Sequence, residues 1–227
     1  MGGSFIPHLS LDEPIGFLQV LDLPLTHLRF HCCVEVGVLV PVKRDKRLYS
    51  PKWSKAKKRL SSCICASLRS RVDFQVINYR RAHDQLGRAV ITVDKVEMLS
   101  MCTIKAERAE YYKDREIRAE MNEYAYDDAD RNLAIQEEAH QMIKKEGIYA
   151  QYDFFSAMEE YFHTPIEELL KSSDILIKIL CLLDRRIGKR TLRKMEDTIL
   201  DEHELIQYFY RLRCEAENIK IAMWPSL

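Results

Sequence analysis

The sequence predicts an α+β protein, in which a helix plus a three-stranded antiparallel meander is followed by a charged helical connector and a C-terminal helical bundle. Three observations predict this fold. Apolar residues recur at helical spacing from Trp53, strict alternation with short turns follows between Val72 and Met101, and the rest of the chain carries helical patterns. Hydrophobic residues make up 47% of the 227 residues and charged residues 31%, which is typical of a chain that folds.

Residues 1–52 differ in composition from the rest of the chain. They hold five of the seven prolines, and Arg29 is the single Lys or Arg between Met1 and Val42. Because proline interrupts each short apolar run, we expect a flexible or poorly packed extension; the alternative is a targeting or docking arm. No methionine occurs between Met1 and Met98, so one hypothesis is that translation starts at a non-Met codon near Leu48.

Residues 53–103 are expected to form the helix-plus-meander unit. The helix of about 15 residues has an apolar stripe: Trp53, Ala56, Leu60, Ile64 and Leu68. The three strands are expected at Val72–Val76, Arg88–Val93 and Glu97–Met101, joined by a polar loop at 78–87 and a tight turn at Asp94-Lys95. Turns this short require antiparallel neighbours.

Residues 104–147 are expected to form the charged connector. Asp114–Arg118 and Asp127–Arg131 are i,i+4 pairs of opposite charge, and Ile117, Met121 and Tyr124 form a narrow apolar stripe. This pattern indicates solvated helices with one modest packing seam.

Residues 148–217 are expected to form the helical bundle, with 218–227 as a tail. Thr164-Pro165-Ile166-Glu167 reads as a capping box, and the run Ile175–Arg186 is apolar on nearly every side apart from Lys178, which indicates a central helix. We expect Gly188 to end that helix in a left-handed conformation and Thr191 to cap a helix over Leu192–Leu200.

Composition excludes several classes of protein. The 35 Lys+Arg balance 35 Asp+Glu, so the chain is not a globally basic nucleic-acid binder. Seven cysteines without a Cys-x-x-Cys pair indicate reduced thiols in a cytoplasmic protein rather than a disulfide framework. No apolar run approaches the ~20 residues of a membrane helix, so we expect no membrane partner.

The patterns name no catalytic, metal or cofactor residue. Glu137-x-x-His140 and Glu160-x-x-His163 each place both side chains on one helix face, but a di-iron bundle also needs a single Glu from each of two other helices. There is no phosphate-binding loop and no Gly-x-Ser-x-Gly. We therefore expect no metal and no cofactor, and the catalytic residues of any enzyme stay unknown.

Several motifs resemble those of an uncharacterised family of small bacterial cytosolic proteins. They are Trp53-Ser54-Lys55-x-Lys57, Ala82-His83-Asp84, Ile91-Thr92-Val93-Asp94, Leu183-Asp184-Arg185-Arg186-x-Gly188-Lys189-Arg190 and Phe209-Tyr210-x-Leu212-Arg213. The resemblance covers roughly residues 53–213. It implies domain limits and a bacterial cytosolic origin, and no catalytic residue.

Two basic segments are candidate anion or nucleic-acid contacts. The first is the cationic turn 185–194, with Arg185, Arg186, Lys189, Arg190, Arg193 and Lys194; the second is the loop 78–87, with Arg80, Arg81 and His83. The order helix, three-stranded meander, helix is also that of double-stranded-RNA-binding domains, in which the loop between the first two strands touches RNA. The alternative for the turn is structural, since cations complement the end of a buried helix.

We therefore expect a non-enzymatic protein-interaction module with an unknown protein partner. Nucleic-acid binding through the cationic turn or the 78–87 loop is the alternative, and an unidentified enzyme is the third.

Overall fold

The computed structural model describes residues 53–79 and 86–221. The chain divides into two units, Met1–Pro41 and Val42–Leu227, and all described residues belong to the second. The predicted extension at 1–52 and most of the predicted tail therefore lie outside the described residues. No helix in the described part is both long enough and apolar enough to cross a membrane.

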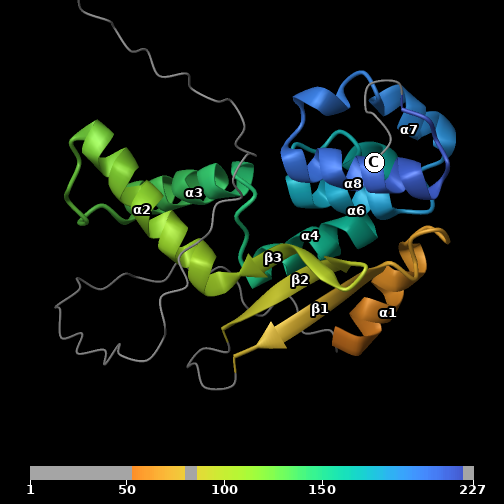
Figure 1. Cartoon of the computed structure of the whole chain (residues 1–227). Helices are drawn as coiled ribbons and strands as arrows, with labels where there is room; N and C mark the ends of the chain where they lie inside the picture. Colours follow the sequence, from red (N-terminus) through yellow and green to blue (C-terminus); the bar gives the residue numbers. More distant parts are fainter. Residues whose placement is uncertain (1–52, 80–85, 222–227) are drawn as a thin grey trace, which may run out of the picture. The chain divides into compact units, whose positions relative to one another are not determined.

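The predicted α+β class is confirmed (Figure 1). The elements, in chain order, are α1 (Trp53–Cys63), β1 (Val72–Asn78), β2 (Gly87–Val93), β3 (Val96–Cys102), α2 (Thr103–Met121), α3 (Ala129–Lys145), α4 (Gln151–His163), α5 (Ile166–Leu169), α6 (Ile175–Leu183), α7 (Lys189–Met195), the 3₁₀ turn η2 (Ile199–Asp201) and α8 (Glu204–Ala216).

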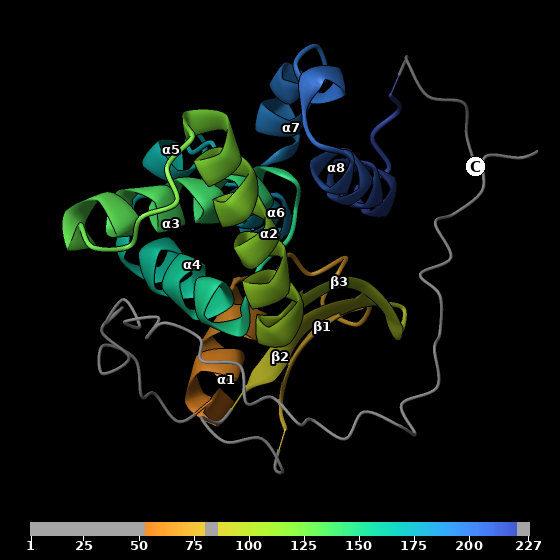
Figure 2. The same cartoon turned by 90° about the vertical axis from the view of Figure 1, so that its left-hand side faces the viewer.

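The three strands form an antiparallel meander in the order β1-β2-β3. Asp94 and Lys95 both have positive φ angles, 51° and 71°, as a two-residue hairpin turn of type I′ requires. α4 packs on β2 and β3 and lies beside α1 (Figure 2). The rings of Phe154 on α4 and Phe74 on β1 stack at 6.2 Å, so the meander and the bundle share one core.

The first helix is shorter than the predicted 15 residues, because it ends at Cys63. The next backbone groups pair with the end of α6: the Cys65 N–H donates to the Leu183 carbonyl at 2.9 Å, and the Arg185 N–H donates to the Cys63 carbonyl at 2.8 Å. A helix cannot continue where its backbone groups bond to another segment. Leu68 is nonetheless fully buried, so the apolar stripe correctly predicted burial.

α6 is the central helix that the sequence predicts. Asp174 caps it by accepting hydrogen bonds from the Leu176 and Ile177 N–H groups, and eight of its nine residues are buried. Lys178 is the exception and pairs with Glu202. α8 runs beside α6 (Figure 1). Cys181 on α6 is so deeply buried that the pKa of its thiol is raised to about 12. α6 is thus the middle of the principal core.

Three predicted caps are wrong. Gly188 has φ −89° and is the N-cap of α7, so it needs no left-handed conformation, and Thr191 lies inside α7 rather than before it. Asp184 instead ends α6, because its buried carboxylate draws the following Arg186 N–H into a 2.7 Å hydrogen bond. Thr164 ends α4, and the short helix α5 has Pro165 as its N-cap without a side-chain hydrogen bond.

Candidate functional site

Two of the predicted cations have structural partners. Arg186 binds the buried Asp184 carboxylate through Nε at 2.8 Å, and the Tyr161 hydroxyl donates to the same carboxylate. The hydrogen bond to Asp184 raises the pKa of the Arg186 guanidinium, and burial raises the pKa of Tyr161 well above its ordinary value. Lys189 donates to the Glu217 carbonyl at 2.8 Å. Arg186 and Lys189 therefore have partners within the fold, but these are the Asp184 carboxylate and the Glu217 carbonyl after α8 rather than the last carbonyl groups of α6.

The other four cations of the turn stay on the surface. Arg185, Arg190, Arg193 and Lys194 are exposed, and none of them takes part in an ion pair within the described residues. On α7 the last three occupy positions i, i+3 and i+4, which lie on one helix face, while Leu192 is fully buried. We call these four residues, Arg185 before α7 and Arg190, Arg193 and Lys194 on it, the α7 cations. Arg80, Arg81 and His83 lie outside the described residues.

The residues of the two Glu-x-x-His motifs make contacts outside their own motifs. His140 on α3 lies between carboxylates from two other helices: its Nδ1 is 3.0 Å from Glu110 Oε2 on α2, and its Nε2 is 2.9 Å from Asp153 Oδ1 on α4. Glu137 accepts a hydrogen bond from Gln141, and His163 contacts Glu159. Each ring nitrogen of His140 thus contacts a carboxylate on a different helix, so His140 ties three helices together. In the described part no group of three His, Cys, Asp or Glu side chains is arranged to hold a metal ion.

Sequence reasoning missed the surface of the α2–α3 hairpin. Seven of the nine large hydrophobic side chains that are exposed among the described residues lie on α2, on α3 or in the loop between them: Ile104, Tyr111, Tyr112, Met121, Tyr124, Tyr126 and Leu133. The predicted seam is partly wrong, because Ile117 is buried whereas Met121 is 42% and Tyr124 is 65% exposed. A concentration of exposed aromatic side chains is typical of protein interfaces.

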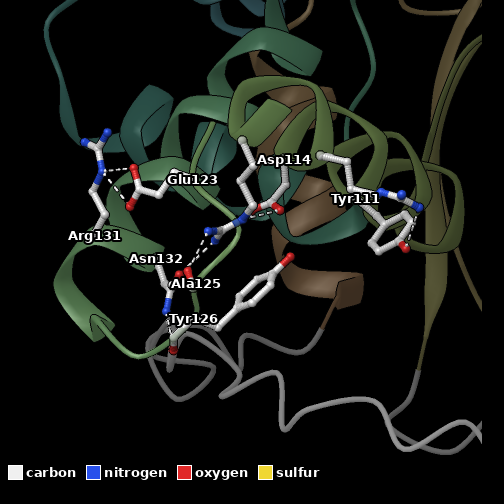
Figure 3. Close-up of polar contacts among 9 residues, drawn as sticks. Tyr111, Asp114, Glu123, Ala125, Tyr126, Arg131 and Asn132 are labelled. Atoms are coloured by element: carbon white, nitrogen blue, oxygen red, sulfur yellow. Dashed lines mark hydrogen bonds and ion pairs between the residues drawn. The ribbon is translucent and has the colours of Figure 1, made fainter. Parts of the chain in front are cut away.

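Arg118 holds the end of this hairpin in shape (Figure 3). Its side chain is 2% exposed and donates to Asp114 at 2.8 Å, to Asn132 at 2.9 Å and to the Ala125 carbonyl at 3.4 Å. Its guanidinium carbon also lies 4.1 Å from the centre of the Tyr126 ring. One buried arginine thereby connects both helices and the loop, so that Tyr126 is positioned before any partner arrives.

Two further tyrosines on α2 have arginine neighbours. Arg115 donates to the Tyr111 hydroxyl at 3.4 Å (Figure 3), and Arg108 lies 5.9 Å from the Tyr112 ring centre. Tyrosine and arginine are the residue types that most often dominate binding energy at interfaces.

The end of the hairpin is acidic. Residues 120–130 contain five Asp or Glu and no Lys or Arg. Glu123 pairs with Arg131 at 2.9 Å, and Asp128 caps α3 by accepting from the Arg131 N–H. We call residues 120–130, which include Tyr124 and Tyr126, the hairpin tip. The signal in the sequence that could have predicted this surface is an acidic run that contains two tyrosines.

A three-stranded meander that shares its core with a bundle of helices defines the class: an α+β protein with a helical hairpin on its surface. The model of the SF0329 protein family matches residues 52–214, which is more than half of the chain, and the chain therefore belongs to this uncharacterised family. The comparisons with curated proteins and with solved structures found no match. Membership in an uncharacterised family is thus confirmed, and the bacterial origin stays a prediction.

Proposed function

We propose that this protein is a cytosolic, non-enzymatic protein-interaction module and that the α2–α3 hairpin is its contact surface. The observation that supports the proposal is the hairpin tip, where Tyr124 and Tyr126 are 65% and 61% exposed within residues 120–130, which hold five Asp or Glu and no Lys or Arg. Exposed tyrosines supply large contact areas at low entropic cost, because each side chain has only two rotatable angles.

The chemistry of the tip selects the kind of partner. Its carboxylates favour a cationic protein surface, and like-charged surfaces are repelled. The aromatic rings add cation–π contacts with lysine or arginine, a contact that Arg118 and Tyr126 already make within the hairpin. The partner proposed here is therefore a protein with a basic surface.

Affinity capture with the double variant Tyr124→Ala/Tyr126→Ala tests this proposal. The purified full-length protein is immobilised and exposed to a nuclease-treated lysate of the organism that encodes it. Truncation of an interface hot spot costs about 2 kcal/mol or more, so the variant should retain its partner at least about tenfold less well than the wild type.

The matched control is Val96→Ala/Leu200→Ala, which removes exposed apolar side chains outside the hairpin. It should retain the partner as the wild type does, and both variants should unfold at the wild-type temperature. Equal retention by the tip variant and the wild type would contradict the proposal.

A second candidate function is nucleic-acid binding by the α7 cations. It is favoured by their exposure and by the common face of Arg190, Arg193 and Lys194, since phosphate contacts by such side chains dominate affinity for nucleic acid. The same capture experiment distinguishes the two functions: material that is retained only when nuclease is omitted is bound through nucleic acid.

A further inference from the structure

Two blocks of like charge occur in a chain whose net charge is zero. Residues 120–130 hold five acids and no base, and residues 185–194 hold six bases and no acid. A surface block of one sign attracts a surface of opposite charge, either within the chain or on a partner.

Within the described residues the two blocks do not meet. In the described part of the chain, the side-chain hydrogen bonds and ion pairs of residues 111–135 stay within 111–146, from Lys113–Glu146 at the base to Arg131–Glu123 at the tip. α7 packs against α8 rather than against the hairpin. Each block is thus turned to the surface.

The acids that the fold does not use are well defined. Glu120, Asp127 and Asp130 are exposed and form no ion pair within the described part of the chain, in contrast to Glu123 and Asp128. They flank the exposed rings of Tyr124 and Tyr126. The tip therefore offers three carboxylates and two aromatic faces to a cationic surface.

We infer that the partner of the hairpin tip is a second copy of this chain, which receives the tip on its α7 cations. The two surfaces match in sign, and the arginines of the α7 cations can stack on Tyr124 and Tyr126 as Arg118 does within the hairpin. Since the two surfaces differ, the contact is head-to-tail, and it builds either a closed ring or an open chain. This inference rests on the proposed function, because it names the partner of the same surface.

Sedimentation velocity of the purified full-length protein tests the inference. At about 0.1 M salt the average sedimentation coefficient should rise with protein concentration up to about 1 mM, since a contact between exposed charges is weak. At about 1 M salt the Debye length falls to roughly 3 Å, and the protein should sediment as a monomer.

Charge reversal on each surface identifies the contact. Glu120→Lys/Asp127→Lys places bases opposite the α7 cations, and Arg190→Glu/Arg193→Glu places acids opposite the tip, so each variant alone should be monomeric. An equimolar mixture of the two should associate again, because opposite charges then face each other in both contacts. The control Lys55→Glu/Lys58→Glu changes the net charge as much as the α7 variant does and should associate as the wild type does.

Three results would overturn the inference. They are a wild-type protein that is monomeric at about 0.1 M salt and about 1 mM, a mixture of the two reversed variants that does not associate, and association that needs an added DNA duplex and is lost only in the α7 variant. The last result would assign the α7 cations to nucleic acid. In each case the hairpin could still bind a different basic protein, which the capture experiment with Tyr124→Ala/Tyr126→Ala decides separately.

Discussion

The helix α6 and the hairpin helix α2 are stabilised by different means. Eight of the nine residues of α6 are buried, all of them apolar, whereas only Thr103, Ala106, Ile117 and Arg118 are buried among the nineteen residues of α2. α6 belongs to the large principal core, whereas the hairpin packs through two small clusters of three buried residues each, one of which includes Ala150 at the start of α4. The hydrophobic effect therefore holds α6, and it contributes little to α2.

Polar ties replace the missing apolar contacts in the hairpin. Arg118 connects α2, the loop and α3 at the tip, and His140 connects α2, α3 and α4 at the base. Because these contacts need few apolar side chains, the tyrosines of the hairpin are left for the surface. The comparison teaches that a helix with few buried residues can be ordered well enough to present a binding surface.

The largest expected effect is in the principal core. Leu180→Ala should lower the free energy of unfolding by about 2–5 kcal/mol, because the side chain is 2% exposed and its loss leaves a cavity. Chemical denaturation measures this loss.

Lys178→Ala, on the same helix, is the matched control. It removes a partly exposed ion pair with Glu202 and should cost at most about 1 kcal/mol. Equal costs at the two positions would show that α6 is not held by its apolar contacts.

A smaller and local effect is expected at the polar tie of the tip. Arg118→Ala leaves Asp114 and Asn132 without their donor and should cost about 1–3 kcal/mol of local stability. Hydrogen exchange of the full-length protein should therefore show lost protection in residues 111–135 and unchanged protection in α6.

The matched control for Arg118 is Arg115→Ala, on the same helix. Arg115 is exposed, and its replacement should change local stability by less than about 0.5 kcal/mol. If protection fell in α6 as much as in the hairpin after Arg118→Ala, the two regions would be one cooperative unit, and the comparison would fail.

The features of the fold that depend on the spacing of apolar residues were predicted correctly from the sequence. The order of helices and strands, the antiparallel meander and the burial of α6 follow from spacings of two and about 3.6 residues, and all three are confirmed. The wrong caps at Gly188 and Thr191 have a different origin. α6 ends at Asp184, whose buried carboxylate accepts a hydrogen bond from Tyr161 on α4, and local patterns do not contain a contact between two such segments; α7 then begins at Lys189, before Thr191.

The candidate site was less predictable for the same reason. The cations of the turn were visible as a run, but only the fold separates Arg186 and Lys189, which have partners, from Arg190, Arg193 and Lys194, which form no ion pair within the described residues. The exposure of the tyrosines on α2 and in the loop after it could not be predicted, since exposure depends on what packs against these segments. Glu110, His140 and Asp153 come from three helices, so no spacing in the sequence joins them.

The smallest expected effect uses alkaline pH to separate the core from the hairpin. Burial raises the pKa of Tyr161 far above its ordinary value, and the Asp184 carboxylate adds to the shift. The unfolded chain loses the phenol proton near pH 10 while the folded protein keeps it, so stability is fully present below pH 10 and falls as the pH rises above it. At about pH 11 this tyrosine should account for a loss of about 1.4 kcal/mol, measured by urea unfolding at about pH 9 and about pH 11.

Tyr161→Phe should reduce the loss by that amount, whereas Tyr124→Phe should leave it unchanged, because Tyr124 is 65% exposed in the folded hairpin. If the stability of Tyr161→Phe fell with pH as much as that of the wild type, the ionisation of the buried Tyr161 would not cause the loss.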